Sequence, residues 1–87
     1  MTLKDTLTDR GKIYGDYGET SYARGAIMTI LRERTKRVTG KDMTAQQEAW
    51  FHDVTLKIVR AAGTPTYTDS WHDLAGYATR IEEHLTK

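Results

Sequence analysis

The chain has 87 residues, of which 38% are hydrophobic and 29% charged, with a formal net charge of +1. These values predict one folded domain over residues 1–87, and the small net charge argues against a protein that coats DNA without sequence preference. Cysteine is absent, which excludes disulfides and zinc–thiolate sites. There is also neither a signal-peptide core nor an apolar run of about 20 residues, so we expect a cytoplasmic protein that does not span a membrane.

The N-terminal segment predicts a short helix followed by a glycine-rich loop. Residues 2–10 place two leucines one helical turn apart. Residues 11–18 contain three glycines, which disfavour a helix and favour a turn. In this loop Tyr14, Asp16 and Tyr17 are expected either to dock on the core or to contact a ligand.

Three longer segments have helical periodicity. Residues 19–37 combine apolar residues at i, i+3 and i+4 with basic residues in the last turns, where cations complement the helix dipole. Residues 44–62 open with Thr44 and Gln47 at the spacing of a capping box. We expect this helix to bury a stripe formed by Phe51, Val54, Ile58 and Ala61 or Ala62.

We expect the last segment to be capped by Thr68 or Asp69 and to extend to Leu85. No stretch of useful length alternates between apolar and polar residues as a strand would. The sequence therefore predicts an all-α fold, a small bundle of about four helices. We expect it to be a homo-oligomer, because one subunit of this size has a thin core.

The segment 44–62 places Asp53, Lys57 and Arg60 on one helix face at i, i+4 and i+7. One interpretation is an exposed Asp53–Lys57 ion pair. The other is that Lys57 and Arg60 bind an anionic ligand, since arginine offers a planar fork for phosphate and lysine a compact charge.

The last segment carries Asp69 and Asp73 one turn apart. Acidic residues in a first helical turn often serve only to complement the dipole, but Asp73 lies a turn further in. Gly76 is unusual inside a helix, where glycine costs about 1 kcal/mol relative to alanine. We expect close approach of another helix or of a ligand to compensate.

Three motifs together resemble a family of small phage and prophage proteins of unknown function. They are the YGD turn at residues 14–16, the KIVR run at residues 57–60, and the sequence DSWHDLAGYA at residues 69–78. The resemblance implies a phage origin, and hence the cytoplasm of a host cell, together with an all-α fold. It implies no particular activity.

A fainter resemblance is to MazG-type nucleotide pyrophosphohydrolases, which hold magnesium through acidic motifs on two helices. This chain differs from them, because it has Lys57 and Arg60 where carboxylates would be expected. Magnesium needs several hard oxygen ligands, so basic residues at these positions disfavour a metal site. The three histidines also lack metal-ligand spacing, and we expect neither a metal nor a cofactor.

The leading hypothesis is a binding protein rather than an enzyme. It would bind a small phosphorylated, nucleotide-like ligand, and it would in this way counter a host defence signal. One alternative is a metal-dependent pyrophosphohydrolase that uses Glu48, Asp69 and Asp73. Another is a protein that inhibits a host factor by direct contact. The candidate ligand-binding residues are Tyr14, Asp16, Tyr17, Lys57, Arg60, Asp69, Trp71 and Asp73.

Overall fold

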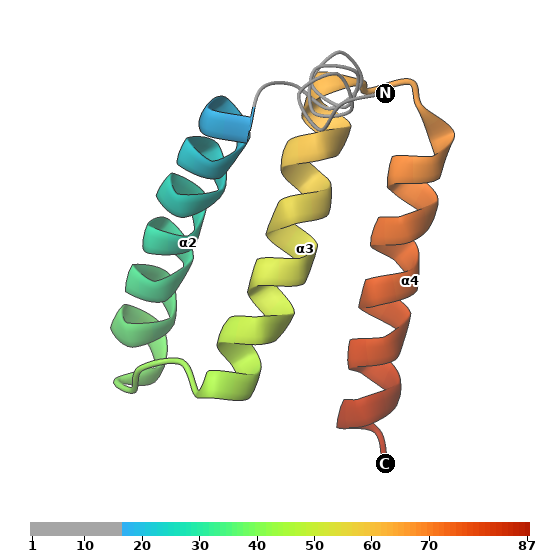
Figure 1. Cartoon of the computed structure of the whole chain (residues 1–87). Helices are drawn as coiled ribbons and strands as arrows, with labels where there is room; N and C mark the ends of the chain where they lie inside the picture. Colours follow the sequence, from blue (N-terminus) through green and yellow to red (C-terminus); the bar gives the residue numbers. More distant parts are fainter. Residues whose placement is uncertain (1–16) are drawn as a thin grey trace.

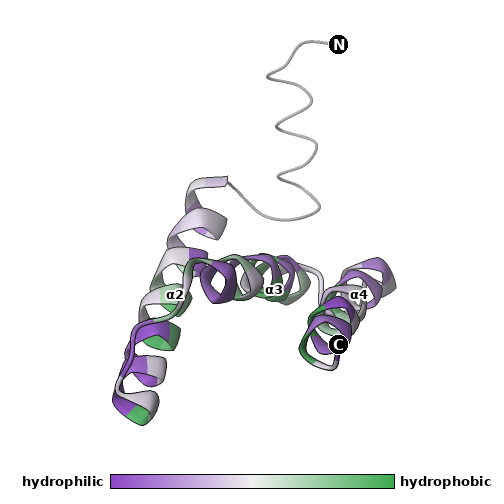
Figure 2. Cartoon of the chain, turned by 90° about the horizontal axis from the view of Figure 1, so that it is seen from below, coloured by the Kyte–Doolittle hydropathy of each residue, from purple (hydrophilic) through white to green (hydrophobic). Residues whose placement is uncertain are grey.

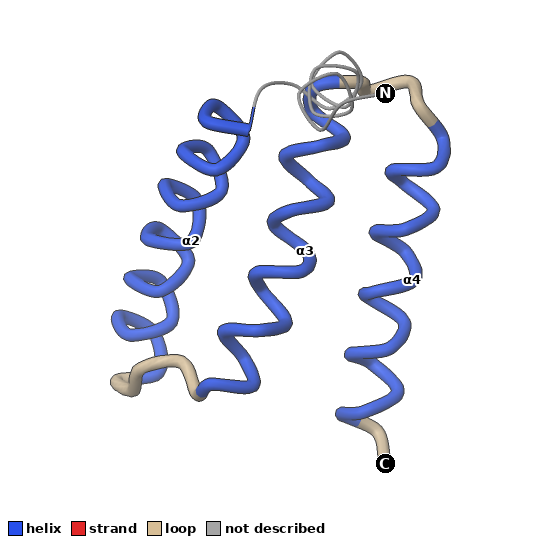
Figure 3. Tube along the Cα trace, viewed as in Figure 1, coloured by secondary structure: helices blue, strands red, loops and turns tan. Residues whose placement is uncertain are grey.

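Three helices contain most of residues 17–87, the part of the chain that the computed structural model describes (Figure 1). They are α2 (Tyr17–Thr39), α3 (Ala45–Gly63) and α4 (Thr68–Leu85), joined by short loops (Figure 3). No strand occurs in this range, which confirms the all-α prediction there, with three helices rather than four. The helix predicted at 2–10 lies outside the described residues.

The start of α3 forms as the sequence predicts. The Thr44 hydroxyl accepts a hydrogen bond from the Gln47 amide at 3.1 Å, and the Gln47 side chain accepts one from the Thr44 amide at 3.0 Å. This reciprocal pair is the capping box, and it satisfies two amides that have no partner within the helix.

The start of α4 differs from the prediction. Its N-cap residue is Tyr67, which makes no side-chain capping bond, and Thr68 is already helical, so the predicted cap at Thr68 or Asp69 is wrong. A side chain from within α4 stabilises the α3–α4 loop instead. The Trp71 indole N–H donates to the Pro65 carbonyl at 2.8 Å and ties the α3–α4 loop to the first turn of α4.

Helix α3 lies between α2 and α4, as the two perpendicular views agree (Figures 1 and 2). On one side the buried Thr55 hydroxyl donates to the Met28 sulfur at 3.6 Å. On the other side the Trp50 and His84 rings meet edge to face at 5.5 Å. The short loops make neighbouring helices antiparallel. The described helices thus form a single layer, in which α2 runs obliquely to α3 (Figure 2).

This arrangement buries few residues. Within residues 17–87, those classed as buried are Met28, Thr55, Val59, Ala61 and Ser70. The predicted stripe of α3 is therefore wrong in part, because Phe51 and Ile58 remain 37% and 43% exposed. The physical reason is that the flanking helices contact α3 on its two sides rather than on its most apolar face. None of these helices has the length and apolar character that a membrane crossing needs.

A charged cluster fastens α2 to α3. The Arg32 guanidinium donates two hydrogen bonds to the Glu48 carboxylate, at 2.6 and 2.9 Å, and His52 Nε2 lies 3.8 Å from the same carboxylate. The hydrogen bonds from Arg32 lower the pKa of Glu48 and raise the pKa of Arg32. Glu48 is therefore a structural partner of α2.

We expect the change Glu48→Gln to lower the melting temperature at neutral pH, because Arg32 loses its charged acceptor. A lowered folded-state pKa stabilises the fold above the ordinary carboxyl value of 4.5, and this contribution is lost as the pH falls through the folded-state pKa. The two proteins should therefore converge in acid. Thermal unfolding by circular dichroism at several pH values measures this, with the exposed Glu33→Gln as the control. Equal effects of the two changes would contradict the role of the pair.

Candidate functional site

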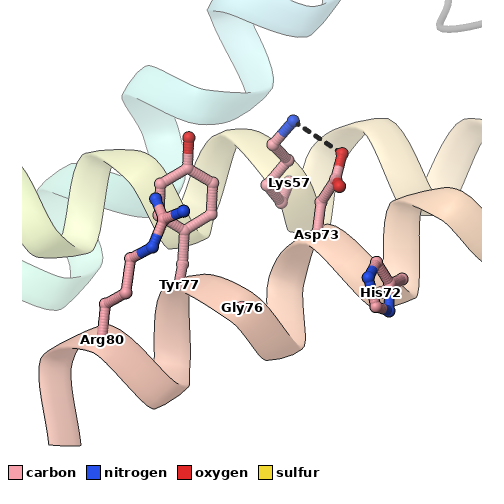
Figure 4. A pocket seen from close by; sticks show the side chains of 6 residues that line it. All are labelled: Lys57, His72, Asp73, Gly76, Tyr77 and Arg80. Carbon is pink, nitrogen blue, oxygen red and sulfur yellow. Dashed lines mark hydrogen bonds and ion pairs between the residues drawn. The ribbon is translucent and has the colours of Figure 1, made fainter. Parts of the chain in front are cut away.

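A groove between α3 and α4 has a volume of about 360 Å³ (Figure 4). One lining residue comes from α3 and the others from α4. The lining residues are Lys57, His72, Asp73, Gly76, Tyr77 and Arg80. The groove thus combines two cations, a carboxylate, a phenol ring, an imidazole and a position without a side chain.

Lys57 joins the two helices at this groove. Its ammonium lies 3.1 Å from the Asp73 carboxylate of α4, as the dashed line in Figure 4 marks. The predicted pairing with Asp53 on the same helix is not formed, because Lys57 lies on the side of α3 that faces α4. Only 15% of the Lys57 side chain is exposed, against 50% for Asp73. Lys57 therefore also packs between the two helices.

Tyr77 places an aromatic ring close to both cations of the groove. The Lys57 ammonium and the Arg80 guanidinium carbon each lie 5.9 Å from the centre of the ring. Both distances are within the range of cation–π attraction, which is strongest when the cation is partly removed from water. The ring therefore helps to hold two positive charges at one place on the surface.

Gly76 leaves open space in the groove. A Cβ atom built at this position meets nothing within 4 Å. The expectation that another helix approaches Gly76 closely is thus wrong for the described residues. Space for a ligand remains as the second explanation for a glycine inside α4, because any larger side chain would project toward the groove.

Of the predicted site residues that the structure describes, Lys57 and Asp73 are the two that it brings together. Four others, Tyr17, Arg60, Asp69 and Trp71, do not line the groove, and the side chain of Trp71 is engaged with the α3–α4 loop. Tyr17 opens α2 and is 78% exposed. Tyr14 and Asp16 lie outside the described residues, so their predicted role stays a prediction.

Sequence reasoning missed Arg80 and gave Tyr77 no role. Their signal was present, because Asp73, Tyr77 and Arg80 have the same i, i+4, i+7 spacing that singled out the basic face of α3. The contact of these residues with Lys57 could not be predicted from the sequence, because it depends on how α3 and α4 are aligned along their lengths.

The geometry does not assemble the acidic residues of the pyrophosphohydrolase alternative. Glu48 and Lys57 are nine residues apart, which is about 14 Å along α3. Glu48 already binds Arg32, whereas Asp73 binds Lys57. Among residues 17–87, no group of three or more acidic, histidine or cysteine side chains is placed to hold a metal ion.

The fold and the groove define a small all-helical protein with a charged cleft between two antiparallel helices. The chain belongs to the family described as domain of unknown function DUF6378, whose model matches residues 3–85. This agrees with the resemblance to a family of unknown function. Neither a curated protein nor a solved structure matches the chain.

We expect the change Gly76→Ala to stabilise the protein by about 1 kcal/mol, because alanine is the better helix former and the added methyl group meets open space. The matched control is Gly25→Ala in α2, where a Cβ atom also meets nothing within 4 Å. Urea denaturation followed by circular dichroism measures both. A loss of stability for Gly76→Ala alone would show that another part of the chain packs on this glycine in solution.

Proposed function

We propose that the protein binds a small phosphorylated, nucleotide-like ligand in the groove between α3 and α4. The observation that carries the proposal is the pair of cations, Lys57 and Arg80, each 5.9 Å from the centre of the Tyr77 ring. Phosphate is recognised by charged hydrogen bonds from lysine and arginine, and a base or sugar by an aromatic face.

The size and openness of the groove suit such a ligand. Its volume of about 360 Å³ lies at the lower end of the range for small-molecule sites. The Lys57 ammonium has three donors and Asp73 needs only one of them, so two remain for an anion. Asp73 is half exposed and supplies an acceptor for the hydroxyl or amino groups of the ligand.

The proposal includes the biological setting that the motifs imply. The protein is of phage origin, acts in the cytoplasm of the host cell as a homo-oligomer, and counters a defence signal by sequestering it. Sequestration requires binding without turnover, which suits a groove of cations better than a site for metal-activated water. It also predicts that affinity does not depend on magnesium.

The test is calorimetric titration of the protein with a panel of mono-, di- and cyclic nucleotides, with and without EDTA. We expect one or more to bind, and Arg80→Ala to weaken binding about tenfold to a hundredfold, since one charged hydrogen bond contributes roughly 1.5–3 kcal/mol. Added salt should weaken binding to the wild type, because exposed ionic contacts are screened.

Two further variants separate a loss of the site from a loss of the fold. Gly76→Leu should fill the groove and abolish binding while the helix content is kept, because its Cβ atom has room. Arg37→Ala, an exposed arginine in the last turn of α2, should change nothing. If no nucleotide binds the wild type, the proposal fails. Magnesium-dependent release of pyrophosphate that requires Asp69 and Asp73 would instead establish the pyrophosphohydrolase alternative.

A further inference from the structure

The three-helix layer leaves one side of α3 open. Successive residues of a helix are 100° apart, so the contacts of α3 can be placed around its axis. Glu48 and Thr55 point toward α2, whereas Trp50 and Lys57 point toward α4, in nearly the opposite direction. A sector between these two sides holds the partly exposed Phe51 and Ile58. It contains no charged residue.

The flanking helices continue this sector. On α2, Leu31 and Val38 lie about a quarter turn from Met28, which faces α3. Around the axis of α4, Leu74 and Leu85 lie on one side of the residues that contact α3, whereas Gly76 and Arg80 lie on the other side. Because both flanking helices run antiparallel to α3, these sectors open on the same side of the layer. We call the set the apolar face. It consists of Leu31, Val38, Phe51, Ile58, Leu74 and Leu85.

We propose that a second copy of this chain covers the apolar face, which gives a dimer of two three-helix layers. Val38 and Leu85 are 60% and 66% exposed on one copy, so substantial apolar surface remains in water. Three parallel helices about 27 Å long, with neighbouring axes about 9 Å apart, would present a face of roughly 700 Å². Because α2 runs obliquely to α3 (Figure 2), the face is smaller than this and lies below the roughly 800 Å² that each partner contributes to a stable interface, which corresponds to a weak dimer.

Charge on the rims selects one arrangement of the two copies. Arg34 lies on the rim of α2 beside the apolar face, and Glu82 lies on the rim of α4. The contacts of α2 and α4 with α3 place these two residues within about 5 Å of the same height along the layer, at 1.5 Å per residue. A two-fold axis roughly along α3 places α3 opposite α3 and α2 opposite the α4 of the other copy. This arrangement brings Arg34 of one copy close to the oppositely charged Glu82 of the other copy.

The dimer leaves the groove free. Lys57 and Arg80 line it from the side of the layer away from the apolar face, so each copy keeps an open groove. The proposal therefore does not depend on the ligand, and the two can fail separately. Calorimetry tests the ligand and sedimentation tests the dimer.

The experiment is sedimentation velocity of the full chain across a concentration series from about 1 to 100 μM, because association depends on concentration. The wild type should approach twice its mass of 9.9 kDa. Ile58→Glu should raise the dissociation constant at least about tenfold, since it places charge in an apolar contact next to the same charge of the other copy. The control is Ala49→Glu, nine residues away and thus half a turn around α3.

Circular dichroism should show the same helix content for both variants, because Ile58 and Ala49 are exposed in the single copy. A wild type that stays monomeric throughout would overturn the proposal and leave the face to another occupant, such as residues 1–16 or a host protein. Equal weakening by the two variants would also overturn it. Arg34→Glu should weaken the dimer, and adding Glu82→Arg should restore it. Failure of this restoration would overturn the two-fold arrangement.

Discussion

The position of α3 between two helices that contact its opposite sides determines most of what the structure can do. A helix contacted in this way buries residues along both flanks and leaves two faces of the layer open. One face is apolar, with Phe51 and Ile58 at its centre. The other carries the groove, in which Lys57 of α3 meets Asp73 of α4. The layer therefore separates a surface suited to association from a surface suited to ligand binding.

Polar contacts hold this layer together to an unusual extent, because its apolar core is small. The Arg32–Glu48 pair joins α2 to α3, and the Lys57–Asp73 pair joins α3 to α4. Exposed ion pairs contribute little on their own and weaken with salt. They do fix the register of neighbouring helices, and this register decides which residues meet in the groove.

The local features of the sequence predicted local structure well. Periodicity located the three described helices to within about two residues, and the spacing of Thr44 and Gln47 gave a capping box that the structure contains. The predictions that failed were the N-cap of α4 and the contacts between helices. The most apolar stripe of α3 was assigned to the core, because an amphipathic helix ordinarily buries that stripe within its own subunit.

The candidate site shows the same difference between local features, which the sequence indicates, and contacts between helices, which it does not. Lys57 and Asp73 were recognisable as polar residues placed where a solvated surface alone did not account for them, yet their pairing required knowledge of how α3 and α4 align. Arg80 was overlooked because a basic residue in the second half of a helix has an ordinary explanation in the helix dipole. Its place in the groove and its distance of 5.9 Å from the centre of the Tyr77 ring are what single it out.

The buried contact between Thr55 and Met28 also makes the junction of α2 and α3 sensitive to oxidation. Met28 is fully buried, and its sulfur accepts the Thr55 hydroxyl hydrogen bond. Oxidants reach this sulfur only when α2 separates from α3, so the rate of sulfoxide formation follows the local opening of that junction. Once formed, the sulfoxide adds a polar oxygen to a fully buried contact, which disfavours the native packing of α2 on α3 until a reductase removes the oxygen.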